Sequence, residues 1–291
     1  MLNKNKIEFF LFKVAIKSFN SLGLVKTRRI ALYLGWIFYH FIPIRKKVTI
    51  ANLRMAFPEK SLKEIKKLTI RNYQNITITF FELLYLASMS KDEILEQVEF
   101  VGADLLTEKV SSNKGFLVLT GHLGNWEYLV TALALYIGKG LYLLAKPQRN
   151  PYITKWLLET REKFGSKIIE LGVSVKAFYQ ALINNEILGA AGDQRGHKDN
   201  PRVLFFNQPT ALYNGLEAIA LRTESSVLLS ACIRQSDFKY KCYMEELSFS
   251  DLPEKENDKV VELTQRYISF IEKYAKKTPE QYFWMHKIWK Y

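Results

Sequence analysis

The sequence predicts a mixed, mainly parallel α/β sheet flanked by helices, with membrane-associated helices at the N-terminus. Three observations predict this architecture. After residue 114, short apolar runs alternate with segments of helix length, which is typical of strand–helix–strand units. Residues 61–90 show apolar side chains at helical spacing. Residues 1–60 combine basic and bulky apolar side chains, so we divide the chain into a membrane-anchoring segment, 1–60, and a globular domain, 61–291.

The basic character of the chain is concentrated in the first segment. The whole chain carries a net charge of +13, and residues 1–60 hold twelve Lys and Arg against Glu8 and Glu59, which is +10 of that total. A basic arm can bind nucleic acid or an anionic bilayer. Here the charges alternate with apolar residues in 7–12 and 14–19, which favours an amphipathic helix lying in the membrane interface.

Residues 30–44 form a run of fifteen residues without a formal charge. As a helix this run would be about 22 Å long, short of the ~30 Å hydrocarbon core of a bilayer. Tyr33 and Trp36 suit the interface better than the bilayer centre. We expect peripheral or single-pass attachment; the alternative is an ordinary buried helix of the globular domain. No small-residue cleavage site follows, so a cleaved signal peptide is not expected.

The globular domain is expected to begin with a helix. Ser61 and Glu64 have the spacing of a capping box, and Ser90 with Glu93 indicates another helix start. The predicted strands are 116–119, 141–144, 167–169, 187–191, 203–206, 227–233 and 240–244. The predicted helices are 125–136, 151–164, 174–184, 215–223 and a last one that ends at Pro279.

The sequence offers no ligand set for metal or cofactor chemistry. The four histidines lack zinc-binding spacing, and the two cysteines do not join them. Neither a Walker loop nor a G-x-G-x-x-G or G-x-S-x-G motif is present. Cys232 and Cys242 lie in runs expected to form neighbouring strands, and two thiols in the whole chain fit a reducing cytosol. We therefore expect no metal and no cofactor.

The strongest local feature is the segment 120–127, Thr-Gly-His-Leu-Gly-Asn-Trp-Glu, which follows a predicted strand and opens a predicted helix. Ligands of open α/β sheets bind at the carboxyl ends of strands, where His122 is expected to lie. Glu127 would lie in the first turn of the helix, where its carboxylate could hydrogen-bond the imidazole and fix its tautomer. A His at a strand end and a Glu favoured by the helix dipole have the same spacing, so the spacing alone does not decide.

This segment resembles the H-x4-D/E signature of glycerolipid acyltransferases, and most closely that of the bacterial lipid A late acyltransferases. Four further blocks resemble the same family in the same order along the chain. They are Arg45-Lys46-Lys47 with Asn52-Leu53 and Ala56-Phe57-Pro58-Glu59; Lys146-Pro147 with Asn150-Pro151, Arg161 and Gly165; Gly192-Asp193-Gln194-Arg195-Gly196 with 203–206; and 281–287. Together the five blocks cover nearly the whole chain. Lys146 and Lys287 stand where arginine is usual, and 211–214 replaces a Thr-rich stretch.

The resemblance implies a role for each matched residue. His122 would be the general base that takes the proton of the acceptor hydroxyl, with Glu127 as its orienting partner. Arg161 would bind an anionic headgroup or stabilise developing oxyanion charge. The remaining residues expected to bind substrate are Asp193, Gln194, Arg195, Asn125 and Lys146.

The implied reaction is O-acyl transfer from an acyl thioester, carried by acyl carrier protein or coenzyme A, to a hydroxyl of a lipid A precursor of the Kdo-lipid IVA type. The thioester would be a co-substrate, and the expected partners are this donor and membrane lipids, without nucleic acid. The oligomeric state is not indicated. The expected location is the cytoplasmic side of the bacterial inner membrane. The serines lack a strand-to-helix elbow, so direct transfer without an acyl-enzyme is expected.

Two alternatives stay open at this point. The same chemistry could act on another glycolipid or on an aminolipid. A protein of a different class, a non-catalytic basic protein that binds membrane surfaces or nucleic acid, would explain the charge but not the ordered blocks. If the protein is an acyltransferase, with a lipid A precursor or with another lipid as the acceptor, we expect residues 1–44 to anchor it and to take no part in the chemistry.

Overall fold

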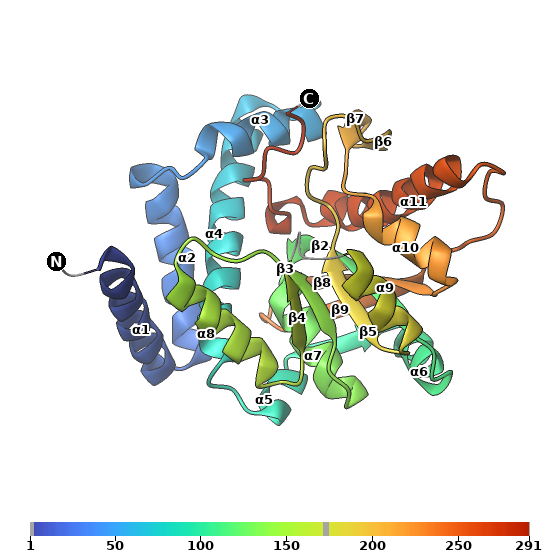
Figure 1. Ribbon diagram of the computed structural model, residues 1–291. Helices are drawn as coiled ribbons and strands as arrows, with labels where there is room; N and C mark the ends of the chain where they lie inside the picture. Colours follow the sequence, from blue (N-terminus) through green and yellow to red (C-terminus); the bar gives the residue numbers. More distant parts are fainter. Residues whose placement is uncertain (1–2, 171–174, 291) are drawn as a thin grey trace.

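The computed structural model describes residues 3–170 and 175–290 (Figure 1). At its centre, the described residues form a seven-stranded sheet in the order β1-β9-β8-β2-β5-β3-β4. In that order the strands are Val98–Val101, Tyr240–Glu246, Val227–Arg234, Phe116–Gly124, Ile187–Ala191, Tyr142–Ala145 and Lys167–Glu170. From β8 to β4 all neighbours are parallel, and β9 turns back antiparallel to β8. The prediction of a mixed, mainly parallel sheet is confirmed.

Helices cover both faces of this sheet because side chains of β2 alternate between two apolar cores. Leu117 and Leu119 pack in one core with α9 (Val175–Ile183), α10 (Gly215–Thr223) and α11 (Glu256–Lys277). Phe116 and Val118 pack in the other core with α6 (Ala103–Ser111), α7 (Trp126–Ile137) and the end of α4. Since successive residues of a strand point to opposite faces, the continuous apolar run of β2 is the pattern of a strand buried on both sides.

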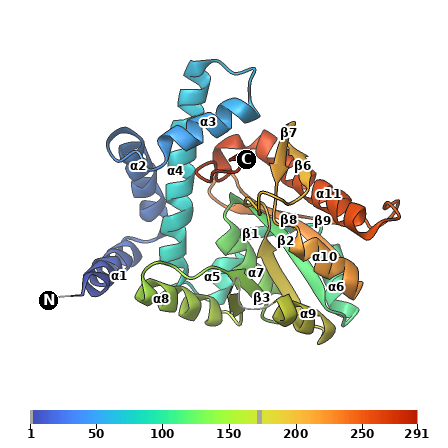
Figure 2. The same cartoon turned by 45° about the horizontal axis from the view of Figure 1, so that its top comes forward.

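The first four helices stand beside the sheet. They are α1 (Lys4–Leu22), α2 (Leu24–Phe41), α3 (Lys46–Ala56) and α4 (Leu62–Leu86). Figure 1 and Figure 2 show α1 and α2 on the side of α4 that faces away from the sheet. The α2–α4 contact is close: a Cβ on Gly35 would lie 2.5 Å from the Cα of Gln74, so only glycine fits there. Large apolar side chains of α1 and α2 are exposed, among them Phe10, Leu11, Val25, Tyr33 and Trp36.

None of the helices in the described residues combines the length and the apolar composition that crossing a bilayer would need. Membrane attachment of this segment therefore remains a proposal, as does the boundary at residue 60. The apolar run 30–44 is divided in the structure, because α2 ends at Phe41 and Pro43 follows. The globular core also includes part of the segment, since Leu53 and Phe57 are buried in the same core as Leu117 and Leu119.

The capping boxes predicted at Ser61 and Ser90 are confirmed at the starts of α4 and of α5 (Lys91–Leu95). Cys232 and Cys242 are direct partners across β8 and β9, and both are buried free thiols.

The strand predicted at 203–206 is real, but as β6 (Arg202–Phe205) it pairs with β7 (Gln208–Ala211) in a separate ribbon. Strands β1 and β7 were not predicted. Of the predicted helix 174–184, Ser174 lies outside the described residues. Pro151–Glu162 forms α8.

Candidate active site

His122 lies near the end of β2, two residues before Gly124, where the chain passes from the strand into α7. We call this passage, residues 122–126, the His122 turn. The register of β2 against β8 shifts between Thr120 and Gly124, so the strand bends where the histidine sits. Gly124 has a φ of +64°, and a Cβ there would lie 1.8 Å from the carbonyl oxygen of Cys232. Glycine is therefore required at this position for two independent reasons. The bend presents the half-buried His122 side chain at the carboxyl edge of the sheet, as predicted.

Asp193 is the hydrogen-bond partner of the His122 ring. Asp193 Oδ1 lies 2.6 Å from His122 Nδ1, and Oδ2 accepts the His122 backbone N–H at 2.8 Å. The Asp193 side chain has no exposed surface, whereas 19% of the His122 side chain is exposed. Asp193 follows β5, which is the parallel neighbour of β2. Ala191, the last residue of β5, pairs with Thr120 of β2. The two strand ends therefore deliver the imidazole and the carboxylate to the same point of the sheet edge.

The electrostatics of this pair favour charge on both members. Burial alone would lower the pKa of His122, but the Asp193 carboxylate and its hydrogen bond, with a smaller contribution from Glu127, raise it above the ordinary value. Burial alone would raise the pKa of Asp193, yet His122 and a hydrogen bond from Tyr282 hold that pKa below its usual range. Asp193 thus stays ionised at neutral pH and stabilises an imidazolium on His122.

The second ring nitrogen of His122 faces a polar side chain. Gln194 Nε2 lies 3.1 Å from His122 Nε2. With Nδ1–H donated to Asp193, the lone pair of Nε2 is the acceptor in this contact. This is the tautomer that a general base needs, because Nε2 can take a proton from a hydroxyl that replaces the Gln194 amide.

The expected hydrogen bond between Glu127 and the imidazole is not made among the described residues. Glu127 instead accepts two hydrogen bonds from Arg161 of α8, at 2.7 Å from Nη2 and 3.2 Å from Nε. This fork-to-fork geometry suits Arg and carboxylate, and both side chains are largely buried. The first turn of α7 directs the Glu127 side chain towards α8. The hydrogen-bond partner of His122 Nδ1 is Asp193 instead. Glu127 acts on His122 here only through its more distant charge.

The other residues predicted to bind substrate have different surroundings. Asn125 has no exposed surface, and its side chain is bonded to Glu82 and to the Tyr128 N–H, so it caps α7 from inside the protein. Arg195 donates its backbone N–H to His286 Nε2 at 3.2 Å and Nη1 to the Lys287 carbonyl. Lys146 is exposed and lines a small pocket together with Arg161.

Tyr267 and the chain after Pro279 support the site in ways that the sequence did not reveal. The Tyr267 hydroxyl donates to the Thr120 carbonyl at 2.7 Å and accepts the Gly192 N–H at 3.1 Å, so α11 fastens the ends of β2 and β5 together. The Phe283 N–H bonds the His122 carbonyl at 2.9 Å. Residues 281–287 resembled a family block, and this contact places that block against the His122 turn. Tyr267 carried no recognisable signal, because its spacing was that of any core residue of the last helix.

Within the described part of the chain, no three His, Cys, Asp or Glu side chains are grouped as ligands for a metal ion. Absence of metal and cofactor from the reaction remains a prediction.

Comparison with known proteins shows the family of the chain. A family model described as bacterial lipid A biosynthesis acyltransferase matches residues 3–291. The chain is similar to the lipid A biosynthesis lauroyltransferase of Escherichia coli (strain K12), with 24% identity over 90% of this chain and 84% of that protein. It is also similar to the palmitoleoyltransferase of the same strain, with 22% identity over 86% of this chain and 80% of that protein.

A third relative, a lipid A biosynthesis acyltransferase of Haemophilus influenzae, is 23% identical over 80% of this chain and 72% of its own length. The family model spans nearly every residue, including the His122 turn, the strand end that carries Asp193 and the segment after Pro279. The chain therefore belongs to the bacterial lipid A biosynthesis acyltransferase family, and it is an acyltransferase.

Proposed function

We propose that the protein transfers a fatty acyl chain from an acyl thioester, on acyl carrier protein or coenzyme A, to a hydroxyl of a lipid A precursor. The acceptor would be a phosphorylated glucosamine disaccharide bearing Kdo, at the cytoplasmic side of the bacterial inner membrane. The observation that carries this proposal is the 2.6 Å contact between His122 Nδ1 and the buried Asp193 carboxylate, which leaves Nε2 as the base. The names of the relatives, which are acyltransferases of lipid A biosynthesis, support a lipid A precursor as the acceptor.

In this mechanism, the acceptor hydroxyl replaces the Gln194 amide at His122 Nε2. His122 removes the proton as the oxygen attacks the thioester carbonyl, and Asp193 stabilises the imidazolium that forms. The tetrahedral intermediate then collapses with breakage of the C–S bond. The leaving sulfur takes the proton from His122 Nε2, so the products are the ester and a free thiol, and the imidazole is neutral again. No covalent acyl-enzyme is needed.

We propose that Arg161 binds a negatively charged group of the substrate. Its guanidinium is fixed by Glu127 and also lines a pocket with Lys146 and Gln148, so a phosphate or the developing oxyanion would meet a positioned cation there. The Glu127 carboxylate then orients Arg161, while its more distant charge still favours the imidazolium. This gives the two members of the H-x4-E motif separate duties.

We also propose that α1 and α2 attach the enzyme to the membrane surface. Phe10 and Leu11 on α1 are 66% and 60% exposed, and Tyr33 on α2 is 74% exposed. Such side chains gain free energy by entering the acyl boundary, and the surrounding lysines and arginines are attracted by anionic headgroups.

The test is mass spectrometry of lipids from a deletion strain complemented with wild type or with His122→Ala. The proposal expects lipid A that lacks one acyl chain in the deletion and in the His122→Ala strain, and full acylation with wild type. An unchanged lipid A accompanied by a change in another glycolipid or in an aminolipid would reassign the acceptor while keeping the chemistry.

A further inference from the structure

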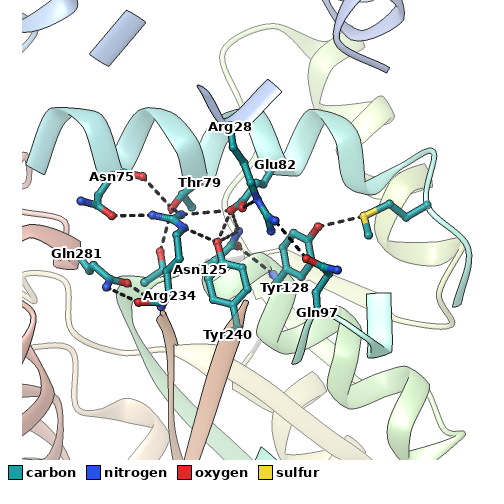
Figure 3. A network of polar contacts seen from close by, with 12 residues as sticks. Arg28, Asn75, Thr79, Glu82, Gln97, Asn125, Tyr128, Arg234, Tyr240 and Gln281 are labelled. Atoms are coloured by element: carbon teal, nitrogen blue, oxygen red, sulfur yellow. Dashed lines mark hydrogen bonds and ion pairs between the residues drawn. The ribbon is translucent and has the colours of Figure 1, made fainter. Parts of the chain in front are cut away.

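A buried carboxylate, Glu82 of α4, lies next to the His122 turn, where it is bonded to the Asn125 side chain. Figure 3 shows the polar network around it. Glu82 has no exposed surface, and the side chains that donate to it are Arg28, Asn125, Arg234 and Tyr240. Burial alone would raise the pKa of Glu82, but Arg234 and Arg28 outweigh burial and hold that pKa below its ordinary value. The group is therefore a charged acceptor at neutral pH.

Asn125 connects Glu82 to the active site. Its Nδ2 donates to Glu82 Oε2 at 2.8 Å, and its Oδ1 accepts the Tyr128 N–H at 3.0 Å, which caps α7. Thr79, one helical turn before Glu82, donates its hydroxyl to the Gly124 carbonyl at 3.0 Å. Through these hydrogen bonds, α4 holds Gly124 and Asn125, which lie between His122 and the helix that carries Glu127.

Arg28 reaches the same carboxylate from α2, inside the segment that carries most of the positive charge. Its Nε donates to Glu82 Oε1 at 2.6 Å, and its Nη1 donates to Gln97 at 3.2 Å. Arg28 is 5% exposed, unlike its neighbour Arg29, which is exposed. Arg28 therefore holds one oxygen of Glu82 while Asn125 binds the other (Figure 3).

We propose that Arg28 is a positioning residue for acyl transfer, which acts from α2 through Glu82 and Asn125 on the turn between His122 and Glu127. This inference rests on the proposed function. It assigns the N-terminal segment a part in the chemistry, where the sequence predicted an anchor alone. Geometry of this kind matters because small displacements of a catalytic group can lower a rate by about 10²-fold.

The physical argument concerns the direction of the Glu82 carboxylate. With Arg28 in place, one oxygen is fixed by Nε and the other oxygen faces Asn125. Without Arg28, Arg234 still neutralises Glu82 through Oε2, so the fold keeps its buried ion pair. The carboxylate then loses the donor that holds Oε1, while Asn125, Arg234 and Tyr240 still bind Oε2. It can pivot about Oε2, and the Asn125 amide bonded to that oxygen then holds the turn less firmly in one place.

The test compares Arg28→Met with Arg29→Met in the full-length enzyme, assayed with detergent-dispersed acceptor so that membrane binding does not limit the rate. Both variants lose one positive charge from α2, but only the first touches the network. Arg28→Met should lower kcat by about 10-fold with KM changed less than about 2-fold, and Arg29→Met should behave as wild type. Arg28→Lys should restore part of the loss.

Two further measurements separate positioning from general weakening. Hydrogen exchange should accelerate in Arg28→Met for amides of residues 122–128 and not for β3 or β5. In an Asn125→Ser background, which keeps a cap on α7 but removes the amide donor to Glu82, Arg28→Met should cause little further loss of kcat. Normal turnover in Arg28→Met, uniform acceleration of exchange, or a full further loss in the Asn125→Ser background would each overturn the proposal. Absence of transfer by wild type would refute the proposed function, and the exchange data alone would then decide the positioning.

Discussion

The Glu127 carboxylate is bound to the Arg161 guanidinium, at 2.7 and 3.2 Å, and the His122 imidazole is bound to Asp193. The two residues of the sequence motif therefore have different partners, each from another part of the chain. Asp193 orients the base and stabilises its protonated form, and Glu127 orients a cation next to the pocket lined by Lys146. This division gives separate expectations for the two carboxylates.

The Glu127–Arg161 pair should contribute to stability as a mostly buried ion pair. Glu127→Gln should lower the free energy of unfolding by roughly 3 kcal/mol, because Arg161 would be left in a largely buried site without its counter-charge. Glu127→Gln combined with Arg161→Met should recover part of that loss. Urea unfolding measures both values. Glu159→Gln is the control, since its pair with Lys155 on the same helix is exposed and should change stability by less than about 1 kcal/mol. Equal effects for the buried and exposed pairs would contradict the geometry.

The pH dependence of the rate should report the environment of His122. A general base works when neutral, so kcat/KM should rise as pH rises through the pKa of His122, which Asp193 raises above 6.5. Asp193→Asn removes the larger favourable charge and should move this midpoint to lower pH, with a lower plateau. Glu127→Gln should move it less, because its charge makes the smaller contribution. Profiles from about pH 5 to about pH 9 test the order of the shifts. A larger shift for Glu127→Gln would reverse the assignment of the two carboxylates.

Glu217 on α10 should make stability depend on pH. Both of its carboxylate oxygens are buried and have no hydrogen-bond partner in the described structure, and burial raises its pKa to about 8. The folded state therefore holds a proton that the unfolded state releases near 4.5, so stability should fall as pH rises from about 4.5 to about 8. Glu217→Gln should remove that slope and be the more stable protein at about pH 8. Thermal unfolding across this range measures the effect, with exposed Glu254→Gln as control. Parallel curves for wild type and Glu217→Gln would show that the carboxyl does not titrate as expected.

Membrane binding should depend on the exposed apolar residues of α1. Phe10→Ser with Leu11→Ser should weaken binding to anionic vesicles by at least about 10-fold, because two side chains that could enter the bilayer are lost. High salt should release only part of the wild type, since the apolar contribution is not screened. Ile183→Ser on α9 removes a comparably exposed apolar side chain and serves as the control in a flotation assay. Equal weakening by the control would mean that α1 is not the docking element.

The sequence predicted the local parts of the site because they depend on nearby residues. The strand before His122, the helix that carries Glu127 and the capping boxes follow from apolar spacing and from side chains three or four residues apart. The Asp193 contact depends on β5 lying next to β2, a choice of neighbour that apolar runs do not encode. Asp193 was predicted as a site residue from its position after a strand, but its bond to the imidazole was not.

Arg28 illustrates a different limit. In the sequence, Arg28 and Arg29 look alike, two basic residues at the edge of an apolar run. Burial of Arg28 depends on Glu82, 54 residues away, and on the crossing of α2 and α4 through Gly35. The sequence does not distinguish a buried arginine, paired with a carboxylate far along the chain, from an arginine exposed to solvent. Strand β1 was missed for a related reason: it has only four residues, two partly buried and two exposed, so its pattern is too short to distinguish from a loop.

The central claim is that neutral His122, held by Asp193, is the base of an acyl transfer. Its most direct test is single-turnover transfer of a labelled acyl chain by purified enzyme to detergent-dispersed lipid A precursor, from acyl carrier protein and from coenzyme A. Wild type should form the labelled ester with at least one donor. His122→Ala should form none above background, and Asp193→Asn should be slower by about 10²- to 10⁴-fold, while both variants remain folded by circular dichroism. Normal transfer by folded His122→Ala would contradict the account.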